Sequence, residues 1–186
     1  MKPLGPVFDR EWRAACSVAP ISRTAANPMV WRHYLGRWPG VCVLTLGLWR
    51  GIRPLGVIVF ALPPRETAKR YGGVTWELAR LWVSSSVPTN GETYLIGKAV
   101  RYIKKARPEV TALVSYADPS AGHSGTIYRA AGWEADGRTD DDRKTPRFDY
   151  MVGEKRYSRR GHVPADATPV RVARVSKHRF VLRLSR

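Results

Sequence analysis

Hydrophobic residues in this chain gather into short runs of strand length, and polar turn sequences separate these runs. The runs at 41–49 and 55–62 flank the sequence Arg-Gly-Ile-Arg-Pro, so they predict a β-hairpin. A third run at 74–83 predicts another antiparallel strand, and residues 65–73 before it are predicted to be a polar connector.

A helical pattern follows the third run. The quartet Thr89-Asn90-Gly91-Glu92 has the form of a capping box, which predicts a helix N-terminus at Thr89. Apolar residues then recur on one helical face until Pro108: Leu95, Ile96, Ala99, Val100 and Ile103. Because a crossover helix joins parallel strands, we expect residues 111–116 to run parallel to the strand at 74–83.

The N-terminal part carries weaker signals. Residues 1–20 are predicted to be an irregular segment with one helical turn at 10–15. Helix signals over residues 22–34 are mixed because Pro28 interrupts them.

The C-terminal part is polar and basic. An acidic, polar loop is predicted after Trp133, followed by a strand at 148–152, a basic loop at 154–160 and a final strand at 177–184. The 186 residues are expected to form one domain, residues 1–186, whose basic C-terminal segment, residues 154–186, ends in a strand.

The net charge of the chain limits the classes of partner that it is expected to bind. Lys and Arg number 32 against 15 Asp and Glu, which gives a net charge of +17, and residues 143–186 alone carry +10. Such an asymmetric basic surface points to a polyanion such as nucleic acid, with a merely soluble cationic surface or the anionic face of a membrane as alternatives. No apolar run is long enough to span a membrane, and no export signal is visible. Cys16 and Cys42 stand far apart without metal-binding spacing, which favours reduced thiols in the cytoplasm.

Polar side chains of several chemical types are concentrated in residues 112–133. An apolar strand ends at Asp118-Pro119, and His123 and Tyr128 follow in a turn and a short helix. In open α/β sheets, ligands bind beyond the carboxyl ends of strands, where this turn lies. We therefore predict that the reaction site is here.

Two other segments are candidates for binding. Residues 30–39 interleave arginines with aromatic residues, a pattern that can stack on bases or grip phosphates, or can instead cover the core. The loop before the helix at Thr89 could hold a cofactor phosphate on the free N–H groups of the helix start. Ordinary capping is the alternative, because Glu92 in the first turn would repel a phosphate. The predicted cofactor-binding residues are Ser84, Ser85, Asn90, Thr93 and Gly125.

The order of elements resembles the GCN5-related acetyltransferase (GNAT) fold. More narrowly, the string Ser115-Tyr116-Ala117-Asp118-Pro119, with Gly122-His123 and Gly125-Thr126-Ile127-Tyr128, is similar to the bacteriophage Mom DNA-modification family. The sequences at 77–83, at His33-Tyr34 and at 177–180 also resemble that family. The resemblance implies an α/β fold with a GNAT-like mixed, mostly antiparallel central sheet and flanking helices.

The resemblance also implies a function. Proteins of the Mom family convert adenine in phage DNA to N6-carbamoylmethyl (acetamido-type) adenine, which protects the genome from host restriction enzymes. The expected substrate is double-stranded DNA with a flipped adenine, because N6 is buried in the duplex stack. The expected location is the cytoplasm of the infected bacterial host. Acyl-CoA, as acetyl-CoA, and iron are the cofactors implied, and a dimer is compatible with the sequence. The true group donor stays open because acyl transfer from acetyl-CoA does not make an N–CH2 bond.

Each predicted site residue has a functional and a structural interpretation. Asp118 would act as general base or orient the amine, or else cap the turn before Pro119. Tyr128 would protonate the thiolate of coenzyme A, or else be an aromatic residue at the core edge. His33 and His123 are candidate bases or metal ligands, and the set implied for iron is His33, Tyr34 and Asp118.

The remaining predicted contacts are with DNA, through basic side chains of two segments. These residues are Arg32, Arg37, Lys155, Arg156, Arg159, Arg160, Lys177 and Arg179. Two functional alternatives remain: a conventional acetyl-CoA-dependent N-acetyltransferase of a small amine or peptide, and a non-catalytic DNA-binding module. The glycine-rich phosphate loop of acetyltransferases, Q/R-x-x-G-x-G/A, is absent from residues 84–91.

Overall fold

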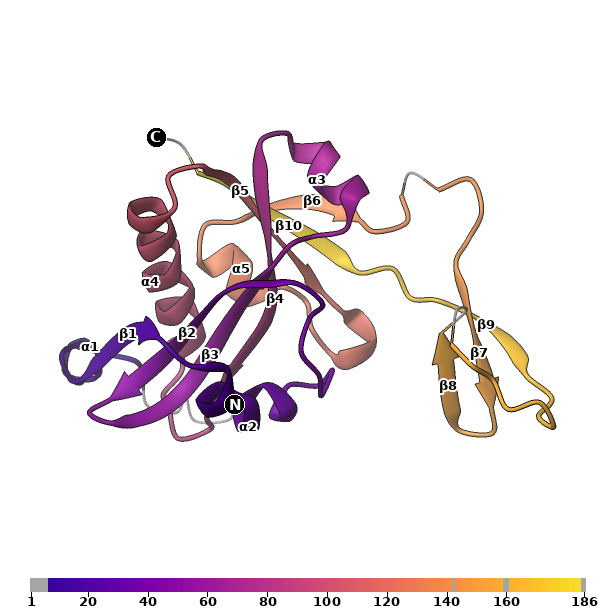
Figure 1. The fold of residues 1–186 in the computed structure, drawn as a ribbon, viewed down its shortest axis with the longest axis horizontal. Helices are drawn as coiled ribbons and strands as arrows, with labels where there is room; N and C mark the ends of the chain where they lie inside the picture. The colour runs from indigo at the N-terminus through magenta and orange to yellow at the C-terminus, as the bar shows by residue number, and fades with distance from the viewer. Residues whose placement is uncertain (1–6, 142, 159–160, 185–186) are drawn as a thin grey trace, which may run out of the picture.

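A seven-stranded sheet forms the centre of the protein in a computed structural model, which describes residues 7–141, 143–158 and 161–184 (Figure 1). Its order is β1-β2-β3-β4-β5-β10-β6, with β4 and β5 parallel and every other neighbouring pair antiparallel. The strands are β1 (Cys16–Pro20), β2 (Cys42–Arg50), β3 (Arg53–Ala61), β4 (Val74–Val83), β5 (Val110–Ala117), β6 (Glu134–Arg138) and β10 (His178–Arg183). The predicted mixed, mostly antiparallel sheet is confirmed.

Helices cover both faces of this sheet. They are α1 (Arg10–Ala15), α2 (Arg23–Arg32), α3 (Arg65–Tyr71), α4 (Gly91–Ala106), α5 (Thr126–Ala130) and the short 3-10 helix η1 (Pro119–Ala121). Side chains of β3 alternate between the two faces. Ile58 and Phe60 lie in one core cluster with α4 and α5, and Val57 and Val59 lie in another with α2. Within the described residues, no helix is long and apolar enough to cross a membrane.

The predicted hairpin, the crossover helix and the parallel strand after it are confirmed, but the start of the helix differs. Helix α4 begins at Gly91, and Asn90 is its N-cap in the left-handed conformation, with φ of 78° and no capping hydrogen bond from its side chain. The capping box at Thr89 is therefore wrong. The Thr89 carbonyl accepts a hydrogen bond of 2.8 Å from the N–H of Phe8, and Val7 pairs with Thr89, so this residue is held in the preceding loop.

Three other segments differ from the prediction because distant parts of the chain order them. Residues 16–20, predicted as irregular, form β1 along the edge of β2. The predicted polar connector contains α3, whose Thr67 and Tyr71 bond to Tyr116 and Asp136 at 3.1 and 2.5 Å. The acidic loop predicted after Trp133 begins with β6, a mostly exposed strand that pairs with β10.

The N-terminal helices and the final strand agree with the sequence. The turn at residues 10–15 forms α1, with Asp9 as its N-cap, and α2 begins after Ser22 and continues through Pro28. The final strand is β10, which lies inside the sheet between β5 and β6.

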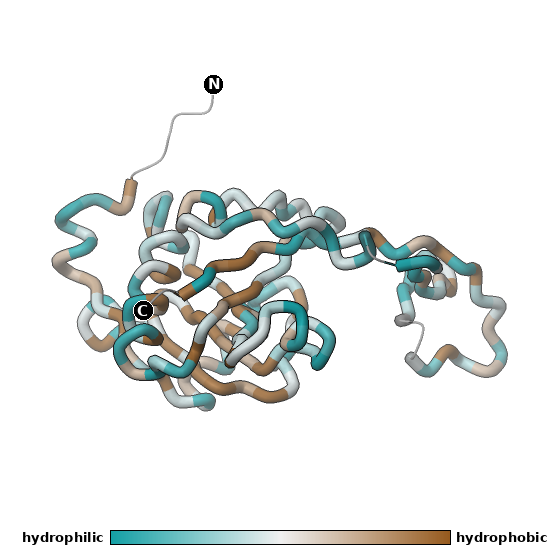
Figure 2. The backbone as a smooth tube through the Cα atoms, turned by 90° about the horizontal axis from the view of Figure 1, so that it is seen from above, coloured by the Kyte–Doolittle hydropathy of each residue, from teal (hydrophilic) through white to brown (hydrophobic). Residues whose placement is uncertain are grey.

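A second, three-stranded sheet is inserted between β6 and β10. It has the order β8-β7-β9, with strands β7 (Phe148–Val152), β8 (Lys155–Ser158) and β9 (Val170–Ala173), and it projects from the body of the protein (Figure 1). Part of the predicted basic loop is therefore a strand. Apolar segments are concentrated in the main body, and the projecting sheet is more polar (Figure 2).

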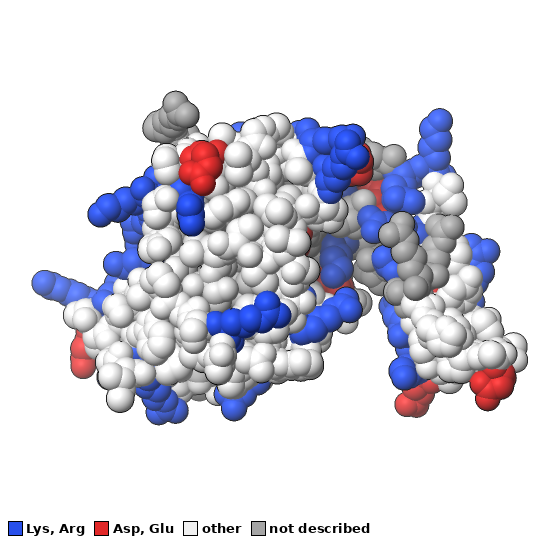
Figure 3. Space-filling model, in the orientation of Figure 1, with Lys and Arg blue, Asp and Glu red and all other residues white. Residues whose placement is uncertain are grey.

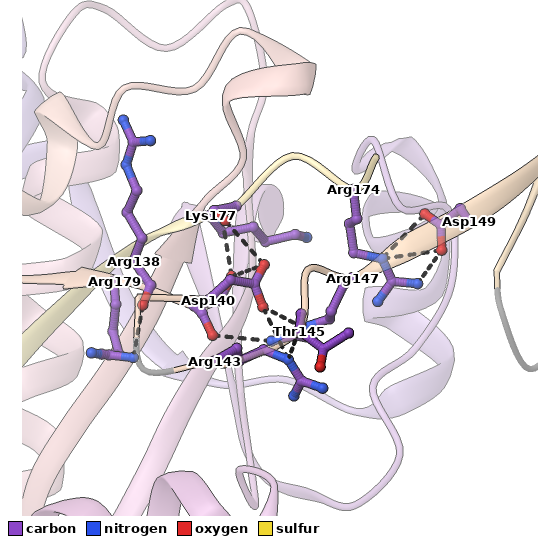
Figure 4. A network of polar contacts seen from close by, with 11 residues as sticks. Arg138, Asp140, Arg143, Thr145, Arg147, Asp149, Arg174, Lys177 and Arg179 are labelled. Carbon is purple, nitrogen blue, oxygen red and sulfur yellow. Dashed lines mark hydrogen bonds and ion pairs between the residues drawn. The ribbon is translucent and has the colours of Figure 1, made fainter. Parts of the chain in front are cut away.

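Ion pairs hold the base of this small sheet (Figure 4). The buried carboxylate of Asp149 accepts hydrogen bonds from Arg156 and Arg174. Asp140, at the exit of the main sheet, pairs with Arg147 and accepts a hydrogen bond of 3.0 Å from Ser176. These contacts join the two connecting segments just where they leave the main sheet.

Gly125 sets the position of α5 on the sheet. It is the N-cap of α5, with φ of 79°, and a Cβ atom there would collide with the ring of Phe180 on β10. Gly122 also has a positive φ, of 74°, but a Cβ atom there would meet nothing within 4 Å. Substitution of Gly122 therefore tests backbone strain alone, and substitution of Gly125 tests backbone strain together with steric overlap.

We expect Gly125→Ala to lower the free energy of unfolding by about 3 kcal/mol, because it adds overpacking to left-handed strain. Gly122→Ala is the matched control and should cost about 1 kcal/mol, from strain alone. Urea unfolding at neutral pH measures both. Equal losses in the two variants would show that the packing of Gly125 on Phe180 contributes nothing.

Candidate active site

A cavity of about 480 Å³ lies where β4 and β5 separate. The two strands pair from Val74 and Val110 as far as Glu77 and Val114, where their pairing ends. Beyond this point the hydroxyl of Ser115 donates to the carbonyl oxygen of Leu78 at 2.9 Å. The cavity is lined by residues 32–35 after α2, residues 77–82 of β4, the end of β5, the turn and helix at 122–128, and Lys177.

The predicted residues His33, Tyr34 and His123 come together in the wall of the cavity. Ring centroids are 4.5 Å apart for His33 and Tyr34, and 5.0 Å apart for Tyr34 and His123. Burial, with the nearby positive charge of Arg80, lowers the pKa of His33 to about 4, so its imidazole is neutral at neutral pH. Its Nδ1 accepts the N–H of Leu35 at 3.2 Å, which leaves the ring hydrogen on Nε2. His33 is therefore arranged as a hydrogen-bond donor.

Asp118 lies at the end of β5 beside the cavity, and other groups already bind its carboxylate. Ser120 donates to Oδ1 from its N–H at 3.0 Å and from its hydroxyl at 2.5 Å, and the ammonium of Lys177 lies 2.9 Å from Oδ2. Burial raises the pKa of Asp118, but the hydrogen bonds from Ser120 and Lys177 outweigh it and hold the pKa below its ordinary value. Burial raises the pKa of the Tyr34 phenol, and the positive charge of the same ammonium opposes this. Asp118 thus caps its turn and orients Lys177, and its role as a base stays a prediction.

Tyr128 lines the cavity but is buried in the core. Its ring packs on Trp133 and Phe180, and its hydroxyl is hydrogen-bonded to that of Ser115 at 2.8 Å. Burial raises the pKa of Tyr128 to about 12, which makes it a weak acid at neutral pH. These contacts agree with the structural interpretation, and the acid role stays a prediction.

Glu77 is a cavity residue for which no role was predicted from the sequence. It lies on β4 at the last paired position, and burial raises its pKa to about 7, although the positive charges of Arg80 and Lys177 oppose this. Arg80 is itself buried, and its Nε donates to the carbonyl of Arg37 at 2.8 Å. The signal in the sequence was a single carboxylate within a mostly apolar strand, three residues before the arginine of the same strand.

The predicted cofactor residues do not all come together. Gly125 lines the cavity, whereas Ser84, Ser85, Asn90 and Thr93 lie in the loop from β4 to α4 and in the first turn of α4, outside it. In this loop the hydroxyls of Ser84 and Ser86 bond to each other at 2.9 Å. A Cβ atom at Gly91 would collide with Val87, so this glycine serves packing.

The residues present therefore do not form a phosphate cradle for coenzyme A. A loop that binds pyrophosphate offers free N–H groups with close backbone approach and little negative charge. Here the loop has no glycine before Gly91, and Glu92 stands in the first turn of α4.

The residues implied for iron lie near one another, but other groups of the protein already bind two of them. Asp118 is held by Lys177, and Nδ1 of His33 accepts a backbone N–H. Among the described residues, no group of three or more His, Cys, Asp and Glu side chains has the arrangement of a metal site. Iron binding stays a prediction.

Some of the side chains predicted to contact DNA are exposed, and others are already bonded to carboxylates of the protein. Arg32 lies on the cavity rim, with its guanidinium 5.5 Å from the centre of the Trp82 ring, and Lys177 lies inside the cavity. Arg179 is buried and donates to Asp136 at 2.8 Å. Lys155 is exposed on β8. Arg37 is exposed, Arg156 is bonded to Asp149, and Arg159 and Arg160 lie outside the described residues.

A family model described as the Mom protein family matches residues 15–186. The chain belongs to the Mom protein family.

One relative in this family is the methylcarbamoylase Mom of Escherichia phage Mu, 30% identical over 109 residues. That match covers 55% of this chain and 45% of the phage Mu protein, so the chain spans less than half the length of that relative.

Solved structures with a similar fold are GNAT acetyltransferases. NAA60 of Arabidopsis thaliana, in complex with acetyl-CoA, has a TM-score of 0.61 at 10% identity and covers 91% of this chain and 98% of that chain. A Bacillus subtilis acetyltransferase in complex with CoA has a TM-score of 0.56 at 13% identity, with coverage of 91% and 98%. These matches confirm the GNAT-like fold of this Mom family member.

We expect Glu77→Gln to stabilise the protein more at pH 8 than at pH 5. A folded pKa of about 7 lies above the ordinary value of 4.5, so the folded state holds the proton more tightly and wild-type stability falls as pH rises between these values. Removing the carboxylate removes this loss, which is on the order of 2 kcal/mol above pH 7. Urea unfolding of both proteins at the two pH values measures it. A gain that does not change with pH would mean that the pKa of Glu77 is ordinary.

Proposed function

We propose that this protein modifies the exocyclic N6 amine of adenine in DNA, attaches a carbamoylmethyl group and so protects phage DNA from host restriction. Membership of the Mom family and the similarity to a phage methylcarbamoylase support the biological role. The observation that carries the chemistry is the half-buried carboxylate of Glu77, whose pKa desolvation raises to about 7, in a cavity walled by aromatic rings. The site of action would be the cytoplasm of the infected bacterium.

The cavity suits a single flipped base. Its volume of about 480 Å³ is in the range of small-ligand pockets, and Tyr34, Trp82 and Tyr116 contribute aromatic rings to its lining. An extruded base is held by stacking and by hydrogen bonds to its edge. Flipping costs a few kcal/mol, which phosphate contacts from a basic surface can offset. Basic side chains lie along the visible face of the protein on both sides of a notch between its body and the projecting sheet (Figure 3).

Proton removal is the step that the chain itself can supply. The N6 lone pair is delocalised into the purine ring, so the amine becomes a useful nucleophile only as its proton leaves. In our proposal the Glu77 carboxylate takes that proton while the N6 lone pair forms the bond to the methylene carbon of a carbamoylmethyl donor. The bond from that carbon to the rest of the donor breaks at the same time, and the remaining donor fragment leaves with its electron pair. A base is most effective when its pKa lies near the working pH, which favours Glu77 over Asp118.

The other cavity groups would bind and orient. His33, neutral with a hydrogen on Nε2, can donate a hydrogen bond to a ring nitrogen of the base or to an oxygen of the donor. Lys177, oriented by Asp118, would place a positive charge where negative charge develops in the transition state. Similar structures bind CoA or acetyl-CoA, but acyl transfer does not make the N–CH2 bond and the loop before α4 is not a phosphate cradle, so the donor stays open. We derive no step through coenzyme A or through iron.

A conventional N-acetyltransferase of a small amine or peptide is the second candidate, favoured by the CoA and acetyl-CoA complexes among similar structures. It predicts normal adenine in the DNA of expressing cells and thermal stabilisation of the protein by acetyl-CoA.

The two functions separate in one measurement. We expect plasmid DNA from bacteria that express the chain to contain deoxyadenosine with the added mass of a carbamoylmethyl group after digestion to nucleosides. Mass spectrometry of the nucleosides reads this directly. Unshifted deoxyadenosine from cells with abundant folded protein would eliminate the proposed reaction.

The same nucleoside assay tests whether Glu77 is the catalytic base that removes the N6 proton. Glu77→Gln should reduce the modified fraction by about 100-fold or more, because it cannot accept the N6 proton. Glu109→Gln, an exposed carboxylate beyond α4, is the matched control and should modify DNA as wild type does. Full modification by Glu77→Gln would assign the base role to another residue while leaving the reaction in place.

A further inference from the structure

The small inserted sheet has two chemically different faces. Residues directly opposite each other in paired strands lie on the same side of a sheet, and successive residues alternate. Tyr150 pairs with Tyr157 on one neighbour and with Arg171 on the other, and Lys155 pairs with Val152. One side therefore carries an aromatic–cationic face, made of Phe148, Tyr150, Lys155, Tyr157 and Arg171. The other side carries the ion pairs of Asp149.

Each cation of the aromatic–cationic face lies over an aromatic ring. The guanidinium of Arg171 is 3.7 Å from the centre of the Phe148 ring, and the ammonium of Lys155 is 5.2 Å from that of Tyr157. The rings of Phe148 and Tyr150 meet edge to face at 5.4 Å. A guanidinium stacked on a ring keeps its N–H groups free at the edge, so it can bind a phosphate oxygen in a fixed direction.

The two cations are also not neutralised. Lys155 and Arg171 are exposed, and in the part of the chain that the structure describes neither forms an ion pair with a carboxylate. Arg156 and Arg174, on the same small sheet or next to it, both bind Asp149 instead. The positive charge available to a partner is therefore concentrated on one face.

We infer that the aromatic–cationic face is a preorganised binding surface for the phosphate backbone of duplex DNA. The charge is complementary to phosphate, and ring stacking restricts two long side chains before binding, so less side-chain entropy is lost in the complex. The small sheet stands beside the main body across a notch with basic side chains on both sides (Figure 3). A duplex held there extends beyond the cavity and offsets the cost of flipping the base. This inference rests on the proposed function, since it takes DNA as the substrate.

The test is the salt dependence of DNA binding. The double variant Lys155→Gln/Arg171→Gln should bind a labelled duplex at least about tenfold more weakly, with the slope of log affinity against log salt reduced by about 2. The control Lys104→Gln/Lys105→Gln removes the same charge from the exposed end of α4, on the far side of the molecule from the small sheet (Figure 1), and should keep the wild-type slope. Fluorescence anisotropy over a range of salt concentrations measures all three proteins. A double variant with the wild-type slope, or a control with an equal loss, would overturn the inference.

A second variant tests the rings of the aromatic–cationic face without changing its charge. Tyr157→Leu should weaken binding by about threefold with the salt slope unchanged, because the ring that orients Lys155 is lost. If Tyr157→Leu bound DNA as tightly as wild type, the proposed role of the rings would be refuted. Circular dichroism and urea unfolding establish that each variant is folded.

DNA binding is measured without catalysis, so failure of this inference can be told from failure of the proposed reaction. Wild type that binds DNA with the expected salt slope but leaves adenine unmodified would refute only the proposed reaction. Adenine modification with unaffected variants would refute only this inference.

Discussion

Strands β4 and β5 pair as far as Glu77 and Val114 and then part, and the cavity depends on this separation. Parting two strands leaves backbone groups without ladder partners, and an unpaired buried backbone group costs about as much as a lost hydrogen bond. Ser115 reduces this cost, because its hydroxyl donates to the carbonyl of Leu78. Ser115 is also hydrogen-bonded to the hydroxyl of Tyr128 at 2.8 Å, which joins α5 to the same point. The core and the cavity thus share one hydrogen-bonded junction.

Burial and positive charge assign different protonation states to the groups around this cavity. Arg80 and Lys177 are cations in or beside it, and both disfavour a charged His33, which is neutral with a pKa of about 4. Asp118 is an anion because Lys177 and Ser120 bind it, whereas desolvation raises the pKa of the half-buried Glu77 to about 7. Groups whose environments push their pKa values apart can take separate parts in one reaction. A hydrogen-bond donor, an ion pair and a base are therefore available at the same pH.

The sequence predicted the elements that local pattern determines. The apolar runs of β2 and β3, the stripe of α4 and the strand before Asp118 are each encoded within a few residues, and they produced the correct order and the parallel pair. The segments β1, α3 and β6 could not be predicted in this way. Their order comes from contacts with distant residues, such as Tyr71 with Asp136. In β6 hardly any side chain is buried, so no alternating pattern exists to be detected.

The site was predicted in part for the same reason. Residues of the motif around Asp118 and His123 could be named because their residue types are chemically distinctive, and His33 and Tyr34 were found through a family resemblance. Glu77 was given no role because its significance comes from burial between two parting strands, which no local pattern encodes. The roles of Asp118 and Tyr128 depend on which groups already bind them, and this too is visible only in three dimensions.

Net charge overstates how much of the basic C-terminal segment can face a polyanion. Arg147 and Arg174 are held by Asp140 and Asp149 (Figure 4). Asp149 also holds Arg156, and Asp136 holds Arg179, so these cations stabilise the attachment of the small sheet and the edge of the main one. A guanidinium already bound to a carboxylate gains less from a phosphate, because the first contact must be exchanged for the second. In our proposal the cations that increase DNA affinity are those supported by rings instead of acids. Stacking orients a cation while leaving its charge available, so the proposal makes the aromatic residues of the small sheet as important to DNA binding as its charge.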